Sequence, residues 1–242
     1  MVTQTNLITI DERVRSPEGV VFSTDPRRAE GENEVSYFIK GPDVGTVFAE
    51  LSGCMLAREI GLPVPDVAAC GFDQETYAGS AKVDDAVRDI EPWLNRRKQI
   101  RNFDDLFGVL VVDVWLANKD RNIGNVIGRP MHGGKIEFVF IDFEKSVALH
   151  PSPIVSSTML KPRELWPSGT LGRALKAKRP LFPPADVIDK IHSLATERCA
   201  EIIHESAAAM GRAVGWEEDS VNALSKRAGK IQELAEEVWA AG

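Results

Sequence analysis

The residues best suited to chemistry stand in one polar stretch and at one later position. The stretch Asn118–Asn125 contains Asp120, and Asp142 follows Asn125 by seventeen residues. Phosphoryl transfer requires a carboxylate that orients the attacking hydroxyl and oxygen ligands that hold magnesium. Asp120 can supply the first, and Asn125 and Asp142 can supply the second.

The spacing of these residues favours this chemical interpretation over a structural one. In kinase catalytic loops the base Asp precedes a metal-binding Asn by five positions, as Asp120 precedes Asn125. A second metal-binding Asp then follows on a short strand, as Asp142 does. The alternative is an Asx-rich turn without a function. Asp142 weakens that alternative because it directly follows an apolar strand, where a carboxylate without a partner is costly.

Strand and turn signals in the first part of the chain predict a small β-rich unit with one helix. We expect three short strands joined by hairpins, with a polar loop before the third: Leu7–Ile10, Val20–Phe22 and Val35–Lys40. Helical spacing then begins behind a Thr46 cap and ends near Gly61. Another strand is expected at Val67–Cys70, and the rest of residues 66–91 stays unassigned.

The remainder of the chain predicts helices around the polar stretch. Phe103–Ala117 is apolar on nearly every helical face, which is typical of a helix buried on most sides. A strand is expected at Ile136–Phe143, behind a Gly-Gly turn. Residues 151–184 are rich in Pro and Ser and are expected to be irregular, with a short helix over 170–178 as an option. Two amphipathic helices should end the chain and pack into the core, one through Ile188, Ile191, Ala195, Cys199 and Ile202, the other through Val221, Leu224, Ala228, Ile231, Leu234 and Val238.

Composition narrows the class of protein. The chain has 242 residues, of which 43% are hydrophobic, enough to bury the core of one domain or of two lobes that share a cleft. Its three cysteines are an odd number without zinc-site spacing, so reduced and mostly buried thiols are expected. No stretch reaches the roughly 18 apolar residues of a membrane span, and the first residues lack an apolar signal core. We therefore expect a cytoplasmic protein that does not bind membranes.

Charge argues against a nucleic-acid partner. The net charge is -7, whereas nucleic-acid binding needs Lys and Arg to replace the counterions around phosphates. The exception is a local basic run, Arg96-Arg97-Lys98 with Arg101, which we interpret as a solvated patch ahead of a helix.

Over roughly residues 35–149 the chain resembles the HipA-like kinases, in particular their compact single-chain branch. In that branch a strand ending in Lys precedes a helix with a Glu and a Gly-Leu-Pro-x-Pro corner. A buried helix, an N-x-D-R-H-x-x-N loop and a strand ending in Ile-Asp then follow. The matching residues here, in the same order and spacing, are Tyr37-Phe38-Ile39-Lys40, Glu50, Gly61-Leu62-Pro63-Val64-Pro65, Val114-Trp115-Leu116-Ala117, the loop from Asn118, and Ile141-Asp142.

The resemblance implies an α+β, bilobal fold related to protein kinases and phosphatidylinositol kinases. A small β-rich N-lobe with one main helix would span residues 1–91, and a larger α-rich C-lobe would span residues 92–242. ATP and Mg²⁺ would be the cofactors, with Asp120 as the base and Asn125 and Asp142 on the metal. Lys40 would contact the α- and β-phosphates, and Glu50 would pair with Lys40. Arg121 would brace the loop through a carboxylate or main-chain carbonyls.

The chain departs from the family pattern in three respects. Asn122 stands where the family has His, so an amide must do whatever that imidazole does in support of the loop. Glu144 follows Asp142-Phe143, where protein kinases carry Gly and small-molecule kinases resembling choline kinase carry Glu. The candidate for a loop that covers phosphates is residues 15–19, which contains a single Gly.

Three functions stay open at this stage. The resemblance implies an ATP-dependent kinase that acts on a protein Ser or Thr. The second is a small-molecule kinase of the aminoglycoside or choline type. The third is a catalytically inactive ATP-binding module, which Asn122 and the poor Gly loop would favour. The acceptor itself is not identified, because its contacts would lie in the unassigned residues 72–102 and 150–184.

Overall fold

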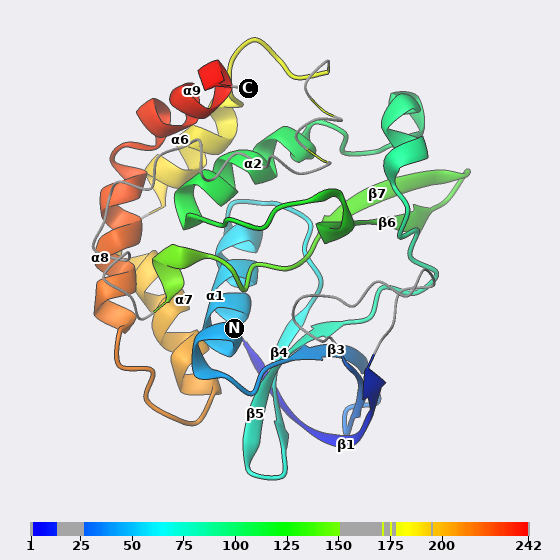
Figure 1. Cartoon of the computed structure of the whole chain (residues 1–242), viewed down its shortest axis with the longest axis vertical. Coiled ribbons are helices and arrows are strands. Elements are labelled where there is room, and N and C mark those ends of the chain that lie inside the picture. The colour runs from blue at the N-terminus through cyan, green and yellow to red at the C-terminus, as the bar shows by residue number, and fades with distance from the viewer. Residues whose placement is uncertain are drawn as a thin grey trace.

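The computed structural model describes residues 2–13, 27–150, 171, 175, 178–194 and 196–241. In this part of the chain, seven strands and six α-helices form a mixed architecture (Figure 1). A closed barrel of five strands lies at one end of the molecule, and most helices lie at the other. The predicted strand Val20–Phe22, the candidate phosphate loop at 15–19 and nearly all of residues 151–177 lie outside the described residues.

The barrel is built from the first five strands in the order β1-β2-β3-β5-β4. Strand β1 pairs in parallel with β4, and the other neighbours are antiparallel. A small apolar cluster that includes Leu7, Tyr37, Ile39 and Cys70 fills its interior. The last residue of β3 is Lys40. The strands are β1 (Thr3–Arg13), β2 (Arg27–Gly31), β3 (Ser36–Lys40), β4 (Val67–Phe72) and β5 (Glu75–Ala81).

Two features of the barrel differ from the sequence prediction. The stretch predicted as a polar loop contains β2, since only the small residues Ala29 and Gly31 face the interior and leave little apolar signal. Strand β5 was not predicted, because its turn uses Asp73 and Gln74 at φ 48° and 68°. Positive φ at both central positions of a hairpin turn is ordinarily signalled by Asn-Gly or Gly.

Helix α1 (Val44–Glu59) connects the barrel to the helical part. Its N-cap is Asp43, whose carboxylate accepts the Thr46 N–H at 2.9 Å, so the predicted cap at Thr46 is wrong by three residues. The predicted end is confirmed, because Gly61 has φ 93° directly after the helix. Every residue from 47 to 57 is buried, because β4 and β5 cover one side of the helix and α7 covers another (Figure 1).

Helix α2 (Asp105–Leu116) is buried along its whole length from Leu106 onward, as its apolar pattern predicted. It ends at Ala117, which has φ 55°, and the polar loop follows. The next elements are a hairpin of β6 (Val126–Met131) and β7 (Lys135–Phe140), joined by the Gly-Gly turn. The strand predicted to reach Phe143 ends at Phe140, because Asp142 has φ 69° and leaves the extended conformation.

Four helices end the chain where two were predicted. The predicted faces are buried as core, but each long helix is broken once, at an extended Leu194 and after Gly229. Ala195 of the first face lies outside the described residues, and Ala228 is half-buried. The helices are α6 (Ala185–Ser193), α7 (Thr196–Ala209), α8 (Glu217–Ala228) and α9 (Ile231–Ala241).

Three predictions from composition and charge can be compared with this fold. All three cysteines are free and buried, as expected. Among the described residues, no helix has the length and apolar character needed to cross a membrane. The basic run at 96–98 and Arg101 is exposed, in agreement with a solvated patch.

Candidate functional site

Lys40 meets three carboxylates where the barrel faces the helical part. Its Nζ lies 2.7 Å from Asp142 Oδ1, 3.4 Å from Glu50 Oε2 and 3.5 Å from Glu144 Oε2. The four side chains are mostly buried, with exposed fractions of 12% for Lys40, 19% for Asp142, 2% for Glu50 and 1% for Glu144. We call Lys40, Glu50, Asp142 and Glu144 the ion-pair cluster. Three of its members were predicted as site residues, and Glu144 was not.

Glu50 fixes the turn that presents Asp142. Its Oε2 accepts the main-chain N–H of Phe143 at 2.7 Å, and its Oε1 accepts the Ser80 hydroxyl at 3.4 Å. Asp142 adopts φ 69°, a left-handed conformation that is uncommon outside Gly and that Asp tolerates better than most residues. The same carboxylate therefore contacts Lys40 from the barrel and holds the turn after β7.

The ion-pair cluster carries an excess of negative charge. Burial disfavours the ammonium of Lys40, but Glu50, Asp142 and Glu144 outweigh this effect and raise its pKa above the ordinary value. Burial raises the pKa of Glu144, and Asp142 and Glu50 add to the rise while Lys40 opposes it. Neither oxygen of Glu144 accepts a hydrogen bond from the residues that the structure describes. Buried carboxylates without full compensation are costly, so this cluster is suited to binding a cation.

Arg121 ties the polar loop to the neighbouring elements. The buried guanidinium contacts the Asp113 carboxylate through two hydrogen bonds of 2.9 and 3.1 Å. It also donates to the main-chain carbonyls of Asn125 at 3.1 Å and of Ile141, and it lies 4.6 Å from the centre of the Phe143 ring. The predicted bracing role is confirmed in both forms, because a carboxylate and carbonyls are both used.

The loop holds the main chain of Asp120 and leaves its carboxylate free of the loop's hydrogen bonds. The Asp120 carbonyl accepts Asn125 Nδ2 at 2.6 Å and Asn122 Nδ2 at 3.0 Å, while the Asp120 N–H donates to Asn118 Oδ1 at 3.2 Å. Asn122 Oδ1 also accepts the Gly124 N–H at 2.9 Å. Asn122, which stands in place of the family's His, therefore bonds to the main chain two residues before it and two residues after it, and these bonds hold the loop closed. Partial burial and the nearby Asp142 raise the pKa of Asp120.

The donor set suits magnesium bound together with phosphates. Asn125 uses its Nδ2 within the loop, and its Oδ1 accepts no hydrogen bond from the described residues. Asp142 brings hard carboxylate oxygens, of which Oδ1 is buried, and Mg²⁺ prefers such ligands. Within the described ranges no group of three or more His, Cys, Asp or Glu forms a self-sufficient metal site. A site for Mg²⁺ that retains waters and phosphate ligands does not require one.

Besides Glu144, sequence reasoning missed two residues of this region. Asp113 is buried in α2, and Asn118 Nδ2 donates to its Oδ1 at 2.9 Å. Asp113 was visible as the single carboxylate inside an apolar helix, which implies a buried cationic partner. Nothing in the sequence singled out Asn118, because other residues of the polar loop could equally have made the hydrogen bond to Asp113.

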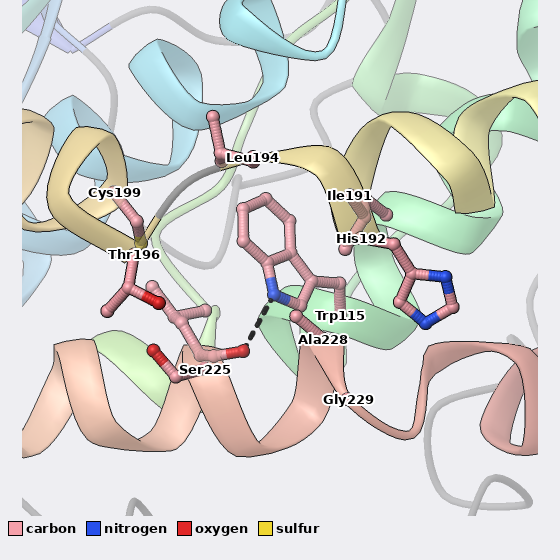
Figure 2. A pocket seen from close by; sticks show the side chains of 10 residues that line it. Trp115, Ile191, His192, Leu194, Thr196, Cys199, Ser225, Ala228 and Gly229 are labelled. Atoms are coloured by element: carbon pink, nitrogen blue, oxygen red, sulfur yellow. Dashed lines mark hydrogen bonds between the residues drawn. The ribbon is translucent and has the colours of Figure 1, made fainter.

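A cavity in the described part of the chain lies elsewhere. Its volume is about 160 Å³, and it is lined by residues beside the breaks that separate α6 from α7 and α8 from α9 (Figure 2). Trp115 lines it and donates its indole N–H to the Leu224 carbonyl at 3.0 Å. None of the five predicted site residues lines this cavity, so the candidate site is the ion-pair cluster with the polar loop.

Comparison with solved structures identifies the fold. The chain matches the proinflammatory kinase CtkA of Helicobacter pylori with a TM-score of 0.59 and 14% identity, over 100% of this chain and 99% of that chain. It matches HipA, from a toxin–antitoxin system of Shewanella oneidensis MR-1, with a TM-score of 0.52 and 13% identity. That match covers 85% of this chain and spans 60% of the HipA chain. No protein-family model and no curated protein matches the sequence. The chain shares its fold with CtkA and with HipA, and the expected resemblance is confirmed at the level of the fold.

Proposed function

We propose that this chain, with the fold of the HipA-like kinases, is an ATP-dependent phosphotransferase with two lobes, residues 1–91 and 92–242. The observation that carries the proposal is the ion-pair cluster. Residues from the barrel, from α1 and from the turn after β7 meet in it, beside the loop that holds Asp120. Phosphoryl transfer depends mainly on positioning and charge, and these are the properties that this cluster offers.

Each predicted residue has a role in this proposal. Lys40 contacts the phosphates of ATP, and Glu50 aims it through their ion pair. Asp120 orients the acceptor hydroxyl and takes its proton late in the transfer. Asn125 and Asp142 hold Mg²⁺, which supplies neutralisation of the phosphate charge when it is bound.

A hydroxyl of a protein Ser or Thr is the acceptor that we propose, and a small-molecule hydroxyl is the runner-up. The hydrogen bonds of Asn122 favour an active enzyme over an inactive module, since they keep the loop closed without the family's His.

Thermal unfolding with nucleotide tests the binding part of the proposal. ATP with Mg²⁺ at millimolar concentration should raise the melting temperature, because a ligand bound only by the folded state stabilises it. Asp142→Ala should lose most of this metal-dependent shift, whereas Asp120→Ala should keep it, because only Asp142 is proposed as a metal ligand. An unshifted wild-type protein would contradict every ATP-dependent function considered for this chain.

Transfer of label from ATP tests the chemistry. Wild-type protein should transfer label, and Asp120→Asn should transfer it about a hundredfold more slowly with nearly unchanged ATP affinity, as expected for a group that acts in the transition state. Label on protein supports a protein kinase, and label on a metabolite supports the runner-up. Equal rates for the two proteins would remove Asp120 as the base. Binding of ATP without any transfer would favour the inactive module.

A further inference from the structure

The ammonium of Lys40 lies at unequal distances from the three carboxylates around it. Asp142 Oδ1 is closest at 2.7 Å, while Glu50 Oε2 and Glu144 Oε2 lie at 3.4 and 3.5 Å. The ammonium is therefore held chiefly by the residue that the proposed function assigns to Mg²⁺. This arrangement raises the question of what retains Lys40 when Asp142 is engaged by a cation.

A divalent cation on Asp142 must loosen the contact with Lys40. The cation neutralises the carboxylate charge that attracts the ammonium, and two cations near one carboxylate repel each other strongly in a buried site. Lys40 then depends on its two remaining carboxylates. An ammonium on a four-carbon stem adopts many rotamers, so without a firm partner it would lose its aim at the phosphates.

The two remaining carboxylates differ in what else they bind. Glu50 Oε2, the oxygen nearest Lys40, already accepts the Phe143 N–H at 2.7 Å. The Glu144 carboxylate accepts no hydrogen bond within the described part of the chain, and its Oε2 lies 3.5 Å from Lys40 Nζ. Glu144 Oε1 lies 3.2 Å from the Nζ of Lys145, whose side chain is 44% exposed. The backbone of Glu144 is itself held, because its carbonyl lies 2.6 Å from His150 Nε2.

We propose that Glu144 is a positioning residue that retains Lys40 in the ion-pair cluster while Asp142 holds the divalent cation. This inference rests on the proposed function and adds to it a residue outside the predicted site. Glu144 acts through Lys40 and not through the cation. Glu144 is buried, its backbone is held, and its Oε2 accepts no hydrogen bond from the described residues, so it can take over the ammonium without breaking a hydrogen bond.

Calorimetric titration with ATP tests the inference in wild type, Glu144→Gln, Lys40→Gln and the double variant. With Mg²⁺, Glu144→Gln should weaken ATP binding about tenfold or more, the scale of one lost charged contact. With EDTA in place of Mg²⁺, Glu144→Gln should bind ATP as well as wild type or better, because Asp142 still holds Lys40 and one negative charge near the phosphates is gone. In the Lys40→Gln background, Glu144→Gln should have no further effect.

The matched control is Glu137→Gln on β7. Glu137 is also a mostly buried carboxylate with two ion pairs, to Arg101 at 3.3 Å and to Arg129 at 3.2 Å, and it lies outside the cluster. The Glu137→Gln variant should bind ATP as tightly as the wild-type protein does, with and without Mg²⁺. If Glu144→Gln does not fold, as judged by its melting curve, Glu144→Asp keeps the charge on a shorter stem and should show a smaller loss that again requires Mg²⁺.

Two results would overturn the inference alone. One is unchanged or tighter binding of ATP with Mg²⁺ by Glu144→Gln. The other is an equal loss from Glu144→Gln with and without Lys40, which would mean that Glu144 contacts the cation or supports the fold. If the wild-type protein binds no ATP in the presence of Mg²⁺, the proposed function and this inference are both overturned.

Discussion

At the residue scale, the site combines a free carboxylate with a rigid main chain. Asn118, Asn122 and Asn125 use their amides to hold the N–H and carbonyl of Asp120, which leaves its side chain outside the loop's own hydrogen bonds. Amides suit this task because each offers donors and an acceptor without a charge. A carboxylate kept available in this way costs stability, because it is partly buried close to Asp142.

That cost gives a prediction for Asp120→Asn. Burial and Asp142 raise the pKa of Asp120 above 3.8, so the ionised carboxyl destabilises the fold at neutral pH. The cost is fully present above the folded pKa, shrinks as pH falls through it, and is absent below the unfolded value. Asp120→Asn should therefore have a higher melting temperature than wild type at pH 7, and the difference should decrease toward pH 4.

Scanning calorimetry at several pH values measures this difference. Asp73→Asn, at an exposed turn of the barrel, controls for the removal of one negative charge from an acidic protein. A melting temperature for Asp120→Asn that is lower than wild type at pH 7 would mean that the carboxylate is stabilised by its surroundings.

At the element scale, α1 and the turn after β7 are in direct contact through Gly53. A Cβ built on Gly53 would lie 2.5 Å from the Phe143 Cβ, a separation that real structures do not tolerate. Phe143 is also held by Glu50, one turn earlier on the same helix, through its N–H. Helix α1 therefore positions Asp142 by shape as well as by charge.

Gly53→Ala tests this contact. The added methyl group must displace Phe143, so we expect a loss of about 1–3 kcal/mol in the free energy of unfolding and weaker binding of ATP with Mg²⁺. Gly229→Ala is the control, because Gly229 has φ −61° and its added Cβ would meet nothing closer than 3.7 Å. It should be neutral or stabilising by about 0.4–1 kcal/mol. Equal behaviour of the two variants in denaturant titration would remove the proposed link between α1 and Asp142.

At the scale of the whole molecule, one apolar core crosses the boundary between the proposed lobes. The main cluster contains Val2, Ala69 and Ala78 of the barrel region together with Ile203 of α7 and Trp239 of α9. Helix α1 lies between these parts and is buried on both sides (Figure 1). Neither part retains its full core without the other.

A single cooperative unfolding transition follows from this continuous core. We expect calorimetric and van't Hoff enthalpies to agree, as they do for two-state domains. Leu51 is fully buried in α1, so Leu51→Ala should reduce the free energy of unfolding by about 2–5 kcal/mol. Unfolding of this variant should still occur in a single transition. Two separate transitions, one of which Leu51→Ala leaves unchanged, would mean that residues 1–91 and 92–242 unfold independently.

The sequence by itself determined the features that depend on near neighbours. The burial of α2, the end of α1 at Gly61, the polar loop and the core faces of the last helices were all correctly predicted. Periodicity and turn residues act over a few positions, so they can be read from the chain directly. The loop residues Asp120 and Asn125 were proposed as site residues on the same basis, since their spacing is a local pattern.

Only the tertiary structure decided how distant charges are paired. Lys40 contacts Glu50 as expected, but its closest carboxylate is that of Asp142. Glu144 also contacts Lys40, although no role was predicted for it. These partners lie about a hundred residues apart along the chain, and their distances result from how α1, the barrel and the turn after β7 pack. Strand β2 and the helix breaks at Leu194 and Gly229 were decided in the same way. Packing against the rest of the molecule outweighs local preference there, because burial acts on the complete fold and not on a window of sequence.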